Sequence, residues 1–155
     1  MLGQVEIINY PPEELKNCKF QYDDLTIEGG AKESSKAYFS QKKKYTGCAI
    51  NFVNNRIGYY AYKFSDGKLE QLIVTYENGL LERDFRFKNG LADGFHRMWF
   101  EDGRKYIEEN YKDGKPLKRM RWYDNGQLAR EVNYKNEQLV NELLYKRDGT
   151  LKSTN

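Results

Sequence analysis

The side chains most able to carry out chemistry are few and far apart in this chain. The only histidine, His96, lies in the middle of an expected strand. As a general base it would need a nucleophile and an orienting acid at hydrogen-bond distance, and no residue at a recognisable spacing supplies them. Acidic residues recur at Asp84, Glu108 and Glu131, and spacings of 24 and 23 residues favour cross-strand ion pairs over a catalytic pair. We therefore expect neither enzyme activity nor catalytic residues.

The sequence also lacks the usual signatures of metal and cofactor sites. It contains no Gly-x-Ser-x-Gly motif, no phosphate-binding loop and no cluster of metal ligands. Its repeated Asp-Gly pairs lack the alternating acids and terminal Glu of a calcium loop. We expect no metal and no cofactor. The two cysteines, Cys18 and Cys48, show no disulfide-scaffold or Cys-x-x-Cys pattern, which favours reduced cytosolic thiols.

A basic stretch that contains aromatic residues is the best candidate for a functional surface. Because successive side chains of a strand point to opposite faces, Arg119 and Arg121 share one face with Tyr123. Lys118 and Trp122 share the other face. Interface energy concentrates in Trp, Tyr and Arg, although a solvated face with aromatic supports has the same composition. The predicted partner-binding residues are Arg97, Lys118, Arg119, Arg121, Trp122 and Tyr123.

The elements that position these residues are indicated by a regular series of turn signals. Asn-Gly or Asp-Gly pairs recur every 11 to 13 residues, with one gap of 23. Such pairs favour tight β-hairpins, in which both central residues adopt positive φ. In the long gap Asn136-Glu137 replaces the pair, and because a non-Gly residue is strained there we expect a different turn. The pairs lie at residues 66–67, 78–79, 89–90, 102–103, 113–114, 125–126 and 148–149.

The segments between these turns predict an all-β fold. We expect about nine antiparallel strands that form a meander, in one extended, twisted sheet of a single layer. Aromatic residues recur in columns, as at Phe64, Phe87, Tyr111 and Tyr134, and both faces carry them, because the neighbours Trp99 and Phe100 must point to opposite faces. Cross-strand aromatic pairs contribute about 0.2–1 kcal/mol each. The expected strands lie within residues 45–55, 56–66, 68–78, 80–89, 91–102, 104–113, 115–125, 127–136 and 138–148.

The chain divides into a small cap and a repeat array. Residues 1–35 form the expected N-terminal cap, with a short strand at 4–9, a helical turn at 11–15 and a loop at 28–35. Residues 36–155 form the array, in which Lys42–Lys44 coincide with a turn position and residues 152–155 are a frayed end. The cap carries seven acids and three lysines, whereas the array carries 23 basic and 16 acidic residues. The array is therefore mildly basic, which suits an anionic partner.

Several segments resemble variants of the MORN repeat, whose pattern is roughly Y-x-N-G-x-L-x-x-E. They are YENGLLE at 76–82, FKNGLADG at 87–94 and WYDNGQL at 122–128. The segment 38–47, YFS followed by YTG, resembles the start of bacterial antitoxin and immunity proteins built from this repeat. The resemblance covers about residues 36–152. The repeat glycine survives only at Gly47 and Gly94, so we expect a flatter or reshaped array.

This resemblance implies a binding module. The bacterial group is associated with polymorphic toxin systems, so we expect an immunity protein or antitoxin that covers the active site of a cognate toxin of nuclease or deaminase type. The alternative is a scaffold or membrane-surface module that uses the basic face. Nucleic-acid binding is disfavoured by a net charge of only +3 and by interspersed acids. Because residues 1–8 are too short and polar for a signal peptide and no apolar run reaches the roughly 18–20 residues of a membrane span, we expect a cytoplasmic location.

Overall fold

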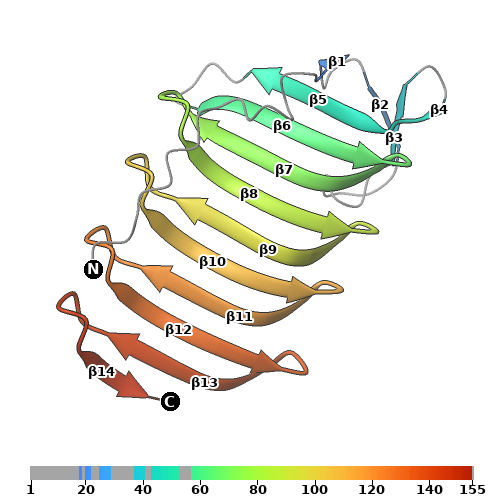
Figure 1. Ribbon diagram of the computed structural model, residues 1–155. Coiled ribbons are helices and arrows are strands. Elements are labelled where there is room, and N and C mark those ends of the chain that lie inside the picture. Colours follow the sequence, from blue (N-terminus) through green and yellow to red (C-terminus); the bar gives the residue numbers. More distant parts are fainter. Residues whose placement is uncertain are drawn as a thin grey trace.

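The main body of the protein is one open antiparallel sheet in which each strand pairs with the next along the chain (Figure 1). The computed structural model describes residues 18, 20–21, 25–28, 37–40, 43–52 and 57–154. This confirms the all-β, single-layer meander. Its ten strands are β5 (Gly47–Phe52), β6 (Ile57–Ser65), β7 (Lys68–Tyr76), β8 (Leu81–Lys88), β9 (Leu91–Trp99), β10 (Lys105–Lys112), β11 (Lys115–Trp122), β12 (Leu128–Lys135), β13 (Gln138–Tyr145) and β14 (Leu151–Thr154).

The last strand, β14, corrects one expectation. Each of the nine predicted ranges contains one of the strands β5 to β13, but residues 152–155 were expected to be frayed. Instead Ser153 pairs with Leu144 and Thr154 with Leu143. The Asp148-Gly149 turn causes this, because it returns the chain along β13.

A small second sheet lies beside the first strands of the meander. It consists of β2 (Thr26–Glu28), β3 (Ala37–Ser40) and β4 (Lys43–Lys44), while β1 (Phe20–Gln21) pairs in parallel with β5. Lys43 and Lys44 thus belong to a strand rather than to the expected turn. The expected domain boundary at 35/36 falls between β2 and β3, which pair with each other. The strand expected at 4–9, the helical turn at 11–15 and the loop residues 29–35 lie outside the described residues.

Two kinds of turn alternate along the chain. At one end of the strands the turn has two residues that both have positive φ, as at Asn89 (50°) and Gly90 (79°), which is a type I′ turn. At the other end it has three residues, and only the last has positive φ, as at Gly79 (85°). There the Gly79 N–H donates to the Tyr76 carbonyl at 3.0 Å, and the Tyr76 N–H donates to the Leu80 carbonyl at 2.8 Å. The prediction of two positive φ values therefore holds at only one end of the strands.

The turn at Asn136-Glu137 differs from its prediction. Asn136 and Glu137 have φ of 52° and 65°, and Lys135 pairs with Gln138, so this hairpin keeps the type I′ geometry of the other two-residue turns. The pairing of β12 with β13 leaves only two residues to connect them. The strand register therefore imposes a left-handed conformation that Glu137 by itself disfavours.

Replacing Glu137 with glycine should stabilise the protein by about 0.5–1 kcal/mol, because a left-handed L-residue is more strained than glycine. The exposed ion pair that is lost, from the Lys115 Nζ to a Glu137 carboxylate oxygen at 3.4 Å, contributes little. Urea unfolding of Glu137→Gly beside Glu137→Gln checks this. An unchanged or lower midpoint for the glycine variant would contradict it.

A bulge recurs in the strands that follow the type I′ turns, and the strands of Figure 1 are visibly bent. In β11, Leu117 is the additional residue between Pro116 and Lys118, which oppose consecutive residues of β10. An additional residue is inserted in the same way just before Gln71 and just before Asn141. Because the repeat glycine is missing at all three places, its loss has not removed the bulge. Bulges bend a strand and increase its twist.

The best-packed core lies at the N-terminal end of the meander. There the small sheet covers one face of β5 to β7, and the cluster is Leu25, Tyr38, Tyr45, Ala49, Tyr62, Phe64 and Leu69. Among the described residues of β9, β10 and β11, by contrast, no side chain is fully buried. Counting only the residues that the structure describes, both faces of these strands are available for contact.

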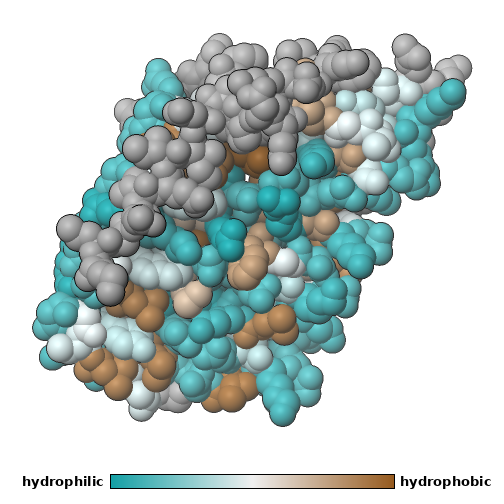
Figure 2. Space-filling view, viewed as in Figure 1, coloured by the Kyte–Doolittle hydropathy of each residue, from teal (hydrophilic) through white to brown (hydrophobic). Residues whose placement is uncertain are grey.

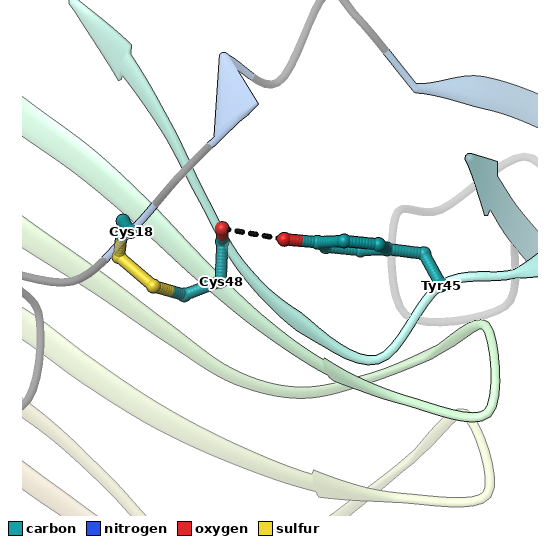
Figure 3. The surroundings of a disulfide bond; sticks show 3 residues. All are labelled: Cys18, Tyr45 and Cys48. Atoms are coloured by element: carbon teal, nitrogen blue, oxygen red, sulfur yellow. Dashed lines mark hydrogen bonds between the residues drawn. A yellow bond between two sulfur atoms is a disulfide. The ribbon is translucent and has the colours of Figure 1, made fainter. Parts of the chain in front are cut away.

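A disulfide between Cys18 and Cys48 fastens the start of the chain to β5 (Figure 3). The prediction of reduced thiols is thus wrong. The two residues are 30 apart in sequence, and the parallel pairing of β1 with β5 brings their Cα atoms to 4.9 Å, an ordinary disulfide separation. Beside it the Tyr45 hydroxyl donates to the Cys48 carbonyl at 2.7 Å, and burial raises the pKa of that hydroxyl, so it remains a donor.

Candidate functional site

The predicted partner-binding residues divide between the two faces of the sheet, as alternation requires. Arg97 opposes Glu108, and Glu108 opposes Met120, so these three side chains share a face. Lys118 and Trp122 flank Met120 at a spacing of two and lie on the same face, which we call face A. Arg119 and Arg121 alternate with them and lie on the opposite face, which we call face B.

Arg97 and Lys118 of face A are neutralised by cross-strand ion pairs. The Arg97 Nε donates to the Glu108 carboxylate at 2.8 Å, and Lys105 reaches the same oxygen at 3.0 Å. Burial raises the pKa of Glu108, but these two hydrogen bonds outweigh it and the net pKa is lowered. Lys118 lies 2.9 Å from Glu131 and lowers its pKa in the same way. The prediction of cross-strand ion pairs is confirmed for Glu108 and Glu131. It is wrong for Asp84, which forms its ion pair with Arg86 of the same strand and accepts a cross-strand hydrogen bond from Gln71. Arg97 and Lys118 are not free cations.

The two aromatic residues of the predicted site serve different purposes. Trp122 is half-buried, and the Lys105 Nζ lies 5.1 Å from its ring centroid. The Tyr123 hydroxyl donates to the Tyr145 carbonyl at 2.9 Å, one hairpin further along the chain. Tyr76, which lies two repeats before Tyr123, makes the equivalent hydrogen bond to the Trp99 carbonyl at 2.8 Å. Tyr123 is therefore a structural link between repeats.

Face B contains a hollow of about 320 Å³ between β10, β11 and β12. Arginine dominates its lining, although the same surface also includes one acid and one aromatic ring. The lining residues are Tyr106, Ile107, Glu109, Arg119, Arg121 and Arg130. The hollow therefore collects two of the predicted residues, Arg119 and Arg121, and adds four that the sequence analysis missed.

The arginines of this hollow are not equivalent. Arg119 pairs with Glu109, and the Arg130 Nε donates to Glu142 at 2.5 Å. Arg121 is exposed, its guanidinium carbon lies 5.7 Å from the Tyr106 ring centroid, and no carboxylate of the described residues is within ion-pair distance. Among the described residues, it is therefore the cation of the hollow that is left to meet a ligand.

The register of β11 and β12 places two of the arginines of this hollow opposite each other. Arg121 stands directly opposite Arg130. Like charges at opposed positions of a sheet are destabilising. Glu142 relieves Arg130 from the other side, but an anion between the two guanidinium groups would relieve both. The turn alone does not give this pairing, because a bulge in β12 places Trp122 opposite Leu128 and Arg121 opposite Arg130.

His96 also lies on face B, where it packs between aromatic rings. Its ring centroid is 4.6 Å from that of Phe85, 5.1 Å from Phe87 and 4.9 Å from Tyr111. Its Nε2 lies 2.7 Å from the Arg86 carbonyl, so this nitrogen carries the proton. Burial lowers the pKa of His96, and the nearby Arg86 carbonyl, Glu109 and Asp84 only partly oppose this. The contacts are those of a cross-strand packing residue.

We expect the stability of the protein to fall as the pH drops below about 6.5, the ordinary pKa of histidine. Between the lowered pKa of folded His96 and that value, the unfolded chain binds more protons, so the free energy of unfolding rises with pH. Urea midpoints across about pH 5 to 8 measure this. The variant His96→Phe keeps a ring but cannot titrate, and its curve should be flatter. Equal slopes for the two proteins would contradict the assignment.

The side shown in Figure 2 is largely hydrophilic, and its hydrophobic residues form separate patches rather than one continuous area. In the part of the chain that the structure describes, no group of three or more His, Cys, Asp or Glu is placed to hold a metal ion. No helical segment of that part has the length and apolar character needed to cross a lipid bilayer.

A scan of the sequence against models of protein families found no match. A search of curated proteins likewise found no similar sequence.

Proposed function

We propose that this protein is a binding module whose face B hollow receives acidic side chains of a partner protein. The observation that supports it most directly is the opposition of Arg121 and Arg130 across β11 and β12, with Arg121 lacking a carboxylate among the described residues. Arginine suits this role because its planar guanidinium binds a carboxylate through two parallel hydrogen bonds. A carboxylate that enters the hollow would gain such bonds and relieve the repulsion between the two cations.

We further propose that the partner is a cognate toxin and that the protein is its immunity protein or antitoxin. The MORN-like repeats of residues 36–152 support a surface built for contact. Nuclease active sites are often built from carboxylates that hold metal ions, and an arginine-lined hollow complements such a site. Covering those carboxylates would block the toxin. The scaffold or membrane-surface function is the alternative.

The cytoplasmic location expected from the sequence belongs to this proposal, and the disulfide of Cys18 with Cys48 opposes it. Disulfides persist in oxidising compartments and are rare in the reducing cytosol. Alkylation of free thiols at the moment of cell lysis distinguishes the two cases. A reduced pair supports a cytoplasmic location, and an oxidised pair supports an oxidising compartment.

The test is binding to the toxin candidate encoded next to this gene. We expect Arg121→Glu to weaken the complex about 30-fold or more, the size of a hot spot of about 2 kcal/mol. Lys115→Glu, the same charge reversal on the same strand but outside the hollow, should change the affinity less than about threefold, as is usual for a rim charge. Cells that express the toxin should survive with the native protein and with Lys115→Glu, but not with Arg121→Glu.

Three outcomes would count against the proposal. The first is no complex and no protection by the native protein. The second is an equal loss of affinity in both variants, which would indicate a general charge effect. The third is flotation with anionic vesicles at low salt in the absence of toxin binding, which would favour the membrane-surface alternative.

A further inference from the structure

The asparagines of the three described Asn-Gly turns are held very differently. The Asn78 Nδ2 donates to the Glu101 carbonyl at 2.9 Å, and its Oδ1 accepts from the Leu80 N–H at 2.9 Å. Asn125 makes the same two bonds two hairpins further along the chain, at 2.8 and 3.1 Å. Each of these side chains is thus fixed at both ends of its amide.

Asn89 has neither bond. It is exposed at the tip of the β8–β9 hairpin, and no hydrogen bond joins its side chain to any other residue that the structure describes. The glycines that follow these asparagines also differ in how their N–H groups are hydrogen-bonded. The N–H groups of Gly79 and Gly126 donate to carbonyls of their own turns at 3.0 Å, whereas the Gly90 N–H has no such acceptor within the described ranges.

Asn-Gly is the dipeptide most open to attack on its own side chain, because glycine places no Cβ in the way. After losing its proton to base, the glycine nitrogen attacks the side-chain amide carbon and forms a new C–N bond. The bond from that carbon to the amide nitrogen then breaks, and the nitrogen takes a proton and leaves as ammonia. Water opens the cyclic imide at either carbonyl to give aspartate or isoaspartate.

We propose that Asn89 is a site of selective spontaneous deamidation in the folded protein. Attack requires both the asparagine amide and the glycine nitrogen to be free to move. At Asn78 and Asn125 the folded state holds both groups, and at Asn89 no hydrogen bond from the described residues holds either one. This inference is independent of the proposed toxin-binding function.

The hairpin is compatible with the aspartate product. Asp66 and Asp113 occupy the equivalent position of other type I′ turns, with φ of 46° and 47° against 50° for Asn89. Aspartate at residue 89 therefore adds a negative charge without disturbing the turn. Isoaspartate inserts a carbon into the main chain and cannot keep the two-residue connection between Lys88 and Leu91.

The experiment incubates the full-length protein in mildly alkaline buffer and follows each Asn-Gly peptide by mass spectrometry. We expect the amide of Asn89 to convert about tenfold faster or more than those of Asn78 and Asn125, because each of those must first break two or three hydrogen bonds. The same measurement in denaturant, where all three sites share one local sequence type, should give similar rates. The variant Asn89→Asp should remove the fast conversion and leave the two slow ones unchanged.

Equal rates at the three sites of the folded protein would overturn the proposal, and so would a faster reaction at Asn78 or Asn125. The proposal is supported if denaturation leaves the deamidation rate of Asn89 unchanged and raises the rates of Asn78 and Asn125 to the same value. Faster reaction at all three sites on denaturation, with no difference beforehand, would mean that the fold protects Asn89 as well.

Discussion

Replacing Phe64 with alanine should lower the free energy of unfolding by about 3–5 kcal/mol, the usual cost of truncating a buried phenylalanine. Phe64 is 2% exposed. The ring of Tyr38, which comes from the small sheet, has its centroid 4.4 Å from that of Phe64, and the rings of Tyr45 and Tyr62 lie at 5.7 and 6.3 Å. The alanine variant should therefore also loosen the small sheet, which hydrogen exchange at β3 would show.

Phe87 provides the matched control, because it occupies the same position one repeat later. It is only half-buried, and its ring packs against His96 on one side and against the edge of the N-terminal core cluster on the other. We expect Phe87→Ala to cost about half as much in urea unfolding, in proportion to the smaller apolar area it buries. Equal losses for the two variants would mean that the centre of the N-terminal core, at Phe64, is no better packed than its edge, at Phe87.

Removing the disulfide should lower the free energy of unfolding by about 3–4 kcal/mol, the chain-entropy value for a closed loop of about 30 residues. The double variant Cys18→Ser, Cys48→Ser tests this by urea unfolding. Reduction of the native protein should produce the same loss. A small effect in both would mean that the pairing of β1 with β5 alone holds the start of the chain in place.

The double variant also supplies its own control. A reducing agent should shift the unfolding midpoint of the native protein and leave that of the double variant where it is. A shift in both proteins would show that the reductant acts through something other than this bond.

The meander could be predicted because its signals are local. Asn-Gly and Asp-Gly pairs determine where the chain reverses, so the spacing of Gly67, Gly79 and Gly90 already defines strand lengths and neighbours. The division of Lys118 and Arg119 between faces follows from alternation in the same way. Both inferences need only residues that are close together in the sequence.

What could not be predicted depends on contacts between distant residues or on register. The bond between Cys18 and Cys48 follows from a parallel pairing that no turn signal announces. The type I′ turn at Glu137 is imposed by the strands on either side of it. The bulges change which residues oppose one another, so the hollow that joins Arg121 to Arg130 depends on a register that alternation alone does not specify.

The alternation of the two turn types limits how such an array can grow or shrink during evolution. Among the turns that the structure describes, those of two residues lie along one rim of the sheet and those of three residues along the other. Inserting or deleting a single strand would reverse the direction of every later strand, so each later turn would arrive at the wrong rim. Strands would therefore be gained or lost in whole pairs, about 23 residues at a time, if the alternation of the turns is to be kept.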